Sequence, residues 1–338
     1  MPVTHGLTLG KFAPLHHGHQ LVIETALREM DRLSILIYDA PETTSIPLSI
    51  RAAWLRELYP AATVLEAWDG PTAVGDSPEI KHQHEQYILK KLGPEKITHF
   101  YSSEFYGEHV SRALAAVNRQ VDPERATIPI SGSDIRLDPF ISRQFLHPRV
   151  YRDLITNIVF LGAPSTGKST LAKRLADEFN TTWMPEYGRD YWEKHQVNRR
   201  LTPNQLFEIA QGHLEREETL LYQANRILFT DTNAITTCMF AQAYHGTAQP
   251  QLVDLARQAS TRYDLFFLCD VDIPYDDTWD RSGDVDRLVF QKQIYADLLQ
   301  RKIPFITLRG SLDERVKTVE KILAKFQKYS SLADTFMF

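Results

Sequence analysis

The first group of residues that could do chemistry is residues 10–19 (GKFAPLHHGH). An apolar run, residues 6–9, precedes it, and a helical pattern, residues 20–30, follows it. This order predicts a strand that ends in a turn, and a helix that begins at the turn. Backbone N–H groups and the helix dipole favour an anion at such a helix start. Because His16 and His19 lie there, we expect their imidazoles to donate hydrogen bonds to phosphate oxygens.

A second group lies far downstream, where residues 162–169 (GAPSTGKS) match the G-x-x-x-x-G-K-[ST] pattern of a phosphate-binding loop. The apolar run 155–161 precedes it and predicts the strand that such a loop follows. The glycines free the backbone to wrap phosphates, the lysine reaches the β and γ oxygens, and the serine hydroxyl binds Mg²⁺. The residues expected to contact ATP are Gly162, Gly167, Lys168, Ser169 and Thr170. Two unrelated phosphate-binding loops in one chain suggest two reactions on phosphorylated substrates.

Strands and helices alternate around both loops. In the first half the patterns predict strands at 7–12, 33–38, 63–67 and 97–102, and helices at 19–30, 49–58, 79–92 and 108–115. In the second half they predict strands at 155–161, 182–184, 227–230, 265–269 and 305–308, and helices at 168–179, 203–224, 234–244, 252–259, 288–299 and 312–329. This alternation is typical of doubly wound parallel sheets, which bind ligands outside the carboxyl ends of their strands.

The composition is that of a globular protein with two domains. The chain has 338 residues, of which 43% are hydrophobic and 24% charged, and a net charge of −5. An arginine-rich segment, residues 143–152, separates the halves, so we expect one α/β domain over residues 1–152 and another over 153–338. Cys238 and Cys269 lie too far apart in sequence for a metal clip.

Composition also excludes several classes of function. The negative net charge predicts no broad surface for nucleic acid. No apolar run approaches the roughly 20 residues that span a bilayer. We find no secretory signal, and the two cysteines fit buried thiols in a reducing compartment. We therefore expect a cytoplasmic enzyme that acts on small molecules.

The first loop resembles the GxFxPxHxGH signature of the nucleotidyltransferase superfamily. The matching residues are Gly10, Phe12, Pro14, His16, Gly18 and His19. Residues 130–136 (ISGSDIR) resemble the ISSTxIR element of the same superfamily, with glycine in place of the second serine. There Ser131 and Ser133 supply hydroxyls, and Arg136 supplies a guanidinium for a triphosphate.

The resemblance implies a Rossmann-like domain that transfers an adenylyl group. His16 and His19 would contact the ATP phosphates, with His19 nearest the α-phosphate. Arg136 and Ser133 would hold the β and γ phosphates. Lys11 would either add positive charge or face solvent.

Two further stretches resemble the NadR family, and the resemblance covers nearly the whole chain. Residues 102–107 (SSEFYG) resemble its SSExYG stretch, and residues 121–123 (VDP) resemble its VDPxR stretch. That family couples a nicotinamide mononucleotide (NMN) adenylyltransferase to a P-loop nicotinamide riboside kinase. The resemblance implies ATP, NMN, nicotinamide riboside and NAD as ligands, Mg²⁺ as the metal, and Ser103, Glu104 and Tyr106 as substrate contacts.

The kinase half offers two acidic candidates, which the sequence cannot separate. Asp231 ends the apolar strand after the P-loop, and Glu186 ends an earlier strand. Either could serve as the base or hold the metal, with Arg189 beside Glu186 as a substrate contact or the partner in a surface ion pair. The long loop at 270–287 resembles a kinase lid. Its candidates are Arg281 and Arg287 for the transferring phosphate, and Trp279 for stacking on a pyridinium ring or as a hydrophobic plug.

Two other functions fit part of the pattern. A fusion of pantetheine-phosphate adenylyltransferase with dephospho-coenzyme A kinase would also pair these two loops, although the SSExYG stretch argues against it. A catalytically weak NAD-sensing protein is the second alternative. The histidine loop begins within ten residues of Met1, so we expect no helix-turn-helix module before it and no DNA binding. A homo-oligomer is compatible with the resemblance, but the sequence indicates no interface.

Overall fold

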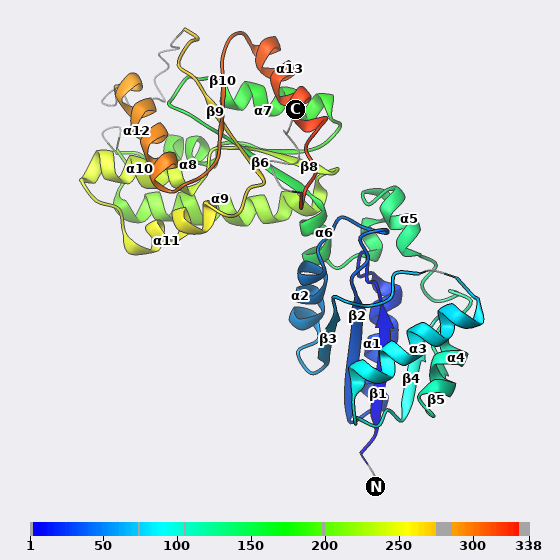
Figure 1. Cartoon of the computed structure of the whole chain (residues 1–338). Coiled ribbons are helices and arrows are strands. Elements are labelled where there is room, and N and C mark those ends of the chain that lie inside the picture. Colours follow the sequence, from blue (N-terminus) through cyan, green and yellow to red (C-terminus); the bar gives the residue numbers. More distant parts are fainter. Residues whose placement is uncertain (1–2, 74, 105, 198–199, 275–285, 331–338) are drawn as a thin grey trace. The chain divides into compact units, whose positions relative to one another are not determined.

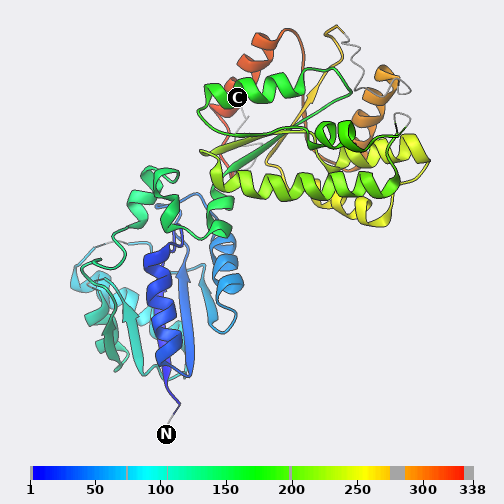
Figure 2. The same ribbon diagram turned by 180° about the vertical axis from the view of Figure 1, so that it is seen from behind.

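The computed structural model describes residues 3–73, 75–104, 106–197, 200–274 and 286–330. The chain divides into two compact units, Met1–Tyr151 and Arg152–Phe338. Each unit contains a five-stranded sheet in which all paired strands run parallel, with helices on both faces (Figures 1 and 2). The predicted fold class, two doubly wound α/β domains, is confirmed. Among the described residues, no helix is long and apolar enough to cross a membrane.

The N-terminal sheet has the strand order β3-β2-β1-β4-β5. Its strands are β1 (His5–Gly10), β2 (Arg32–Tyr38), β3 (Thr63–Ala67), β4 (His99–Ser102) and β5 (Val117–Gln120). Its helices are α1 (His17–Glu29), α2 (Leu48–Leu58), α3 (Pro78–Leu92), α4 (Gly107–Ala113), α5 (Gly132–Leu137) and α6 (Pro148–Leu154), with a 3₁₀ turn η1 (Ile141–Phe145). The chain proceeds outward from β1 in both directions, so the sheet has its topological switch point at β1. Ligands of such sheets bind at that point, beyond the strand's carboxyl end.

The C-terminal sheet has the order β10-β9-β6-β8-β7. Its strands are β6 (Thr156–Leu161), β7 (Trp183–Met184), β8 (Ile227–Asp231), β9 (Leu265–Cys269) and β10 (Ile306–Leu308). Its helices are α7 (Lys168–Glu178), α8 (Tyr187–His195), α9 (Pro203–Gln223), α10 (Ala234–His245), α11 (Pro250–Ala259), α12 (Arg287–Gln300) and α13 (Leu312–Leu323).

Alternating side chains of the central strand β6 fill two separate apolar layers. Ile158 and Phe160 belong to the layer beneath α7 and α13. Val159 and Leu161 belong to the layer on the other face, beneath α9 and α10. The period of two along a strand produces this division. With both faces covered, β6 is held rigidly, and the loop that follows it begins from a fixed point.

Some elements differ from the prediction for identifiable reasons. The edge strand β5 was missed because its side chains, VNRQ, are all exposed and show no apolar alternation. The sequence pattern also missed α8, whose polar residues outnumber its two buried aromatic residues. The prediction for α13 ran to residue 329, whereas the helix ends at Leu323. β1 ends at Gly10 rather than Phe12, whose φ of 46° lies in the left-handed region and cannot continue a strand.

Candidate active sites

The histidine loop leaves the carboxyl end of β1 and ends at α1, as the sequence predicted. His16 is the N-cap residue of α1, and its backbone N–H donates to Nδ1 of His19 at 3.4 Å. The two imidazoles stack with ring centroids 3.7 Å apart. A Cβ at Gly18 would lie only 3.0 Å from Cε1 of His16, so a larger residue there would push this ring aside. The loop therefore holds both rings as one unit.

Both imidazoles are neutral near pH 7. Burial, followed by the charge of Arg125, lowers the pKa of His16 to about 4. Burial and the adjacent His16 lower the pKa of His19 well below its usual value. A neutral imidazole has one N–H donor and one acceptor nitrogen. Nδ1 of His16 is buried and makes no hydrogen bond within the described part of the chain, so it is available to a bound molecule.

The ISGSDIR segment lies against the histidine loop. Ser131 caps α5, with its hydroxyl accepting from the backbone N–H of Asp134 at 3.2 Å. Arg136 donates to the carbonyl oxygen of Ala13 at 2.6 Å and to the hydroxyl of Ser133 at 3.0 Å. Arg136 thus holds together two segments that lie more than 110 residues apart in sequence, the histidine loop and the ISGSDIR segment.

Together they enclose a cavity of about 320 Å³, which we call the histidine cavity. The predicted residues that line it are Lys11, Phe12, His16, Gly18, His19, Ser103, Glu104, Ser131, Ser133 and Arg136. Arg125, the arginine of the VDPxR stretch, was not singled out from the sequence; it also lines the cavity and forms an ion pair with Glu104 at 2.9 Å. Lys11 donates to Glu42 at 2.6 Å and Thr43 at 2.9 Å, so its charge is partly neutralised.

A second cavity of about 410 Å³ adjoins the histidine cavity and is lined mainly by apolar atoms. The two share Phe12, His19, Ser103 and Glu104, among other residues. Predicted residues Gly10 and Tyr106 line this adjoining cavity. The Tyr106 hydroxyl donates to the carbonyl oxygen of Leu9 at 3.4 Å, which fixes its ring. The arrangement provides space for a second molecule directly beside the histidine cavity.

Tyr38, which the sequence reasoning did not single out, also lines the adjoining cavity. Its hydroxyl is buried and has no hydrogen-bond partner among the described residues. A Cβ at Gly70 would lie 2.7 Å from Cδ1 of Tyr38, so the ring packs directly on that glycine. Burial raises the pKa of Tyr38 far above its usual value. The hydroxyl therefore stays protonated.

In the C-terminal unit the predicted P-loop connects β6 to α7. Gly162 has a φ of 144°, and a Cβ there would lie 2.6 Å from the carbonyl oxygen of Cys269. Gly167 has a φ of 80°, which likewise favours glycine. Nζ of Lys168 donates to the carbonyl oxygens of Gly162 and Ala163, each at 3.0 Å.

Three buried or partly buried side chains brace this loop from later in the chain. Gln291 accepts from the backbone N–H of Ala163 at 2.8 Å and donates to the Cys269 carbonyl at 3.0 Å. Arg315 donates to the carbonyl oxygen of Thr166 at 2.6 Å. Arg287, one of the predicted lid residues, donates to the Ser165 and Ile273 carbonyl oxygens. Only Arg287 of these three was anticipated, and it is not among the residues that line the pocket beside the loop.

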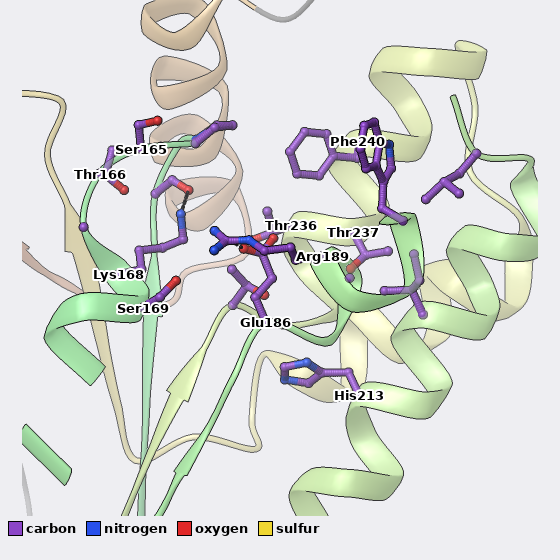
Figure 3. A pocket seen from close by; sticks show the side chains of 18 of the residues that line it. Ser165, Thr166, Lys168, Ser169, Glu186, Arg189, His213, Thr236, Thr237 and Phe240 are labelled. Carbon is purple, nitrogen blue, oxygen red and sulfur yellow. Dashed lines mark hydrogen bonds and ion pairs between the residues drawn. The ribbon is translucent and has the colours of Figure 1, made fainter. Parts of the chain in front are cut away.

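The P-loop lines a pocket of about 220 Å³, the P-loop pocket (Figure 3). The predicted residues that line it are Gly162, Gly167, Lys168, Ser169, Thr170, Glu186 and Arg189. Glu186 is the N-cap residue of α8, and its carboxylate lies 3.7 Å from the guanidinium of Arg189. Trp279 and Arg281, predicted for the lid, lie outside the described residues.

Asp231 and Glu186 occupy different environments. Asp231 ends β8, is fully buried, and accepts a short hydrogen bond from the Ser169 hydroxyl. Its Oδ1 is buried without a hydrogen-bond partner in the described part of the chain. Burial, with a smaller contribution from Glu186, raises the pKa of Asp231 to about 6, although Lys168 opposes the shift. Glu186 is half-buried and faces the pocket (Figure 3).

The candidate metal ligands beside the P-loop are the oxygens of Ser169 and Asp231. Among the described residues, no group of three or more His, Cys, Asp or Glu side chains comes together to hold an ion. The Ser169 hydroxyl and the Asp231 carboxylate, with its unsatisfied Oδ1, are hard oxygen ligands of the kind that Mg²⁺ takes alongside phosphates and water. The residues present therefore fit a magnesium ion that a nucleotide would help to bind.

Two protein families match the two units. Residues 7–137 match the cytidylyltransferase-like family, and residues 157–315 match a family described as an AAA domain. The first match covers the histidine loop and the ISGSDIR segment. The second begins in β6 and covers the P-loop.

Longer relatives and solved structures match both units together. The trifunctional NAD biosynthesis/regulator protein NadR of Salmonella typhimurium (strain LT2) is 28% identical over 323 residues, which cover 90% of this chain and 78% of that protein. The NadR protein of Escherichia coli (strain K12) is 28% identical over 322 residues, with the same coverage. A crystal structure of NadR protein in complex with NAD and AMP-PNP has a TM-score of 0.58 at 21% identity, covering 97% of this chain and 99% of that one. Another, in complex with NR, has a TM-score of 0.58 at 22% identity and covers 95% of each chain.

Proposed function

This chain is a homologue of the NadR proteins over 90% of its length, and from that premise we propose that it catalyses two consecutive steps of NAD biosynthesis. The C-terminal unit phosphorylates nicotinamide riboside with ATP. The N-terminal unit adenylylates the resulting NMN and releases pyrophosphate. The observation that carries the proposal is the pairing of a phosphate-binding loop with an adjoining cavity in the N-terminal unit, alongside a separate P-loop pocket in the C-terminal unit.

For the first unit, we propose that ATP occupies the histidine cavity and NMN the adjoining cavity. A phosphate oxygen of NMN forms a bond to the α-phosphorus of ATP, and the bond from that phosphorus to the bridging oxygen breaks as pyrophosphate leaves with the electron pair. His19, on the boundary between the cavities, would donate to the α-phosphate. His16 and Arg136 would stabilise charge on the leaving pyrophosphate. This adenylyl transfer needs no covalent intermediate with the protein, because alignment of the two substrates and charge stabilisation suffice.

For the second unit, we propose that the 5′-hydroxyl oxygen of nicotinamide riboside attacks the γ-phosphorus while the bond to ADP breaks. Lys168 and the loop N–H groups would bind the phosphates. Ser169 and Asp231 would hold Mg²⁺, which when bound supplies positive charge at the phosphate oxygens. Glu186, which faces the pocket, would take the hydroxyl proton.

The separate environments of the two carboxylates support this assignment. The carboxylate of Asp231 is in contact with Ser169, the residue whose hydroxyl a P-loop places on the metal. Glu186 is more exposed and lines the space that an acceptor would fill. The relatives crystallised with NAD and AMP-PNP and with NR share the fold and thus support the same classes of ligand here.

One incubation tests the proposal directly. The protein is mixed with ATP, Mg²⁺ and nicotinamide riboside, and the products are separated by chromatography. NMN followed by NAD is expected. A parallel reaction with phosphopantetheine as the adenylyl acceptor tests the coenzyme A alternative. Binding of NAD without turnover of either substrate would instead indicate a sensing protein and contradict the proposed activities.

A further inference from the structure

The P-loop pocket has a histidine on its floor that the proposed reaction does not use. His213 lies on the buried face of α9, is 5% exposed, and lines the pocket with Glu186 and Arg189 (Figure 3). Its Nε2 lies 3.8 Å from Oε2 of Glu217, one helical turn later, and has no hydrogen-bond partner in the described part of the chain. A buried polar group in a native protein ordinarily has a partner, so this one requires an explanation.

Glu217 is a fixed, fully buried carboxylate. Its Oε1 accepts from Asn157 at 2.8 Å and from Arg262 at 2.5 Å, and its Oε2 accepts from the Tyr263 hydroxyl at 2.7 Å. Three donors are already directed at its two oxygens, so this side chain acts as a hydrogen-bond acceptor. Because Nε2 of His213 faces this carboxylate, the tautomer with a proton on Nε2 is favoured. In the other tautomer the lone pair of Nε2 would face a carboxylate oxygen.

This carboxylate determines which nitrogen of His213 carries the proton. Burial, the largest influence, lowers the pKa of His213 and favours a ring with a single proton. Glu217 draws that proton to Nε2, because the group that one ring nitrogen faces sets the tautomer. The lone pair of Nδ1 then remains for a molecule in the pocket. It can accept a hydrogen bond from a hydroxyl but cannot donate one to a carbonyl or a phosphate.

We infer that His213 is a specificity-determining residue of the kinase site and that its Nδ1 accepts a hydrogen bond from a ring hydroxyl of the acceptor's ribose. The inference rests on the proposed phosphorylation of a riboside. Phe240 and Tyr244 line the pocket and suit a planar base. In Figure 3 Phe240 lies above Glu186, and the polar His213 lies below it. In the proposed binding mode, a sugar whose 5′-hydroxyl approaches Glu186 would place its ring hydroxyls near His213, which lines the pocket below Glu186 (Figure 3).

The test compares three substrates and three proteins. The substrates are nicotinamide riboside and its 2′-deoxy and 3′-deoxy analogues, and kcat/KM is measured for each. The wild type should prefer the riboside over one analogue by about 10- to 100-fold, since that analogue leaves a buried acceptor unpaired. His213→Asn, whose amide oxygen can occupy the position of Nδ1, should keep most of this preference. His213→Gln, whose amide reaches toward Glu217 instead, should lose it.

Each outcome decides the inference. Equal kcat/KM for all three substrates in the wild type would overturn it, as would a His213→Gln variant that is slower on all three but keeps the preference. If His213→Gln does not fold, the wild type and His213→Asn decide, because both must discriminate. Glu215→Gln, on the exposed face of the same helix, serves as the matched control and should behave like the wild type. A wild type that cannot phosphorylate nicotinamide riboside at all would overturn the proposed kinase function itself, a result distinct from turnover without discrimination.

Discussion

Replacing Arg51 by methionine should disable adenylyl transfer and leave the kinase reaction intact. Arg51 lies in α2, is fully buried, and is not in either N-terminal cavity lining. Its guanidinium donates to three carbonyl oxygens, those of Lys11, Tyr38 and Ile46, of which the last two lie at 2.9 Å. It therefore ties the histidine loop to the end of β2 and to the start of α2.

The expected magnitude follows from these three bonds. Methionine fills a similar volume but leaves three carbonyl oxygens without a donor, and each costs roughly 1–3 kcal/mol when buried. Water that enters beside the loop would lower the sum to about 3–5 kcal/mol. At about 2–4 °C per kcal/mol for a unit of this size, its unfolding temperature should fall by roughly 6–20 °C. A loop displaced by about 1 Å would reduce adenylyl transfer by about 100-fold.

The assay follows both reactions in one preparation, together with thermal unfolding. The kinase rate is the internal control, because Arg51→Met changes only the N-terminal unit. Arg56→Met is the matched control on the same helix, where the half-exposed arginine pairs with Glu66 at 2.6 Å. That pair should contribute about 1 kcal/mol or less and leave adenylyl transfer unchanged. Normal NAD formation by a folded Arg51→Met protein would refute the role of Arg51 in positioning the loop.

Three further predictions concern individual side chains. His19→Ala should lower NAD formation from NMN by about 100-fold or more while riboside phosphorylation continues. Lys168→Ala should lower riboside phosphorylation and leave NAD formation from NMN unchanged. A variant that loses both activities would contradict the separation of the two sites. The pKa of His16, about 4 when folded and 6.5 when free, means that the unfolded chain binds a proton between these values and the folded chain does not. The contribution of neutral His16 to the free energy of unfolding is therefore complete above about pH 6.5 and is lost toward pH 4, a change of about 3 kcal/mol. Urea unfolding of His16→Gln should show a correspondingly smaller pH dependence. Tyr38→Phe removes a hydroxyl that has no partner among the described residues, so the unfolding temperature should stay constant or rise. The KM for NMN should increase, and an unchanged KM would exclude contact between the Tyr38 hydroxyl and the acceptor.

The histidine loop and the P-loop were predictable because the information for them is local. A strand, a glycine-containing turn and a helix follow one another within about 25 residues, and each leaves its own periodic pattern. Strand β9 was predicted with its observed bounds, Leu265–Cys269, because both faces of a central parallel strand are buried and the sequence is continuously apolar. Edge strand β5 has neither feature, so only its pairing with β4 defines it.

The residues that hold the loops in place were not predictable, because their contacts are distant in sequence. Arg315 binds the Thr166 carbonyl across 149 positions, and Gln291 binds Ala163 across 128. An arginine or glutamine in an amphipathic helix has the same local pattern whether it faces solvent or a buried carbonyl. For the same reason the sequence could not separate Asp231 from Glu186, since both follow short strands and only tertiary packing buries one of them.

Unsatisfied polar atoms link the packing of this protein to its proposed chemistry. Nδ1 of His16, the hydroxyl of Tyr38, Nε2 of His213 and Oγ1 of Thr236 are all buried without hydrogen-bond partners in the described part of the chain, and each of these side chains lines one of the three cavities. Leaving such an atom unpaired costs about 1–3 kcal/mol. A bound ligand recovers part of that cost if it forms the missing hydrogen bond, or if it shifts a neighbouring group of the protein that then forms it. The same atoms that weaken the folded chain would therefore favour polar ligands over apolar molecules of equal size, which is the selectivity that the two proposed ATP sites require.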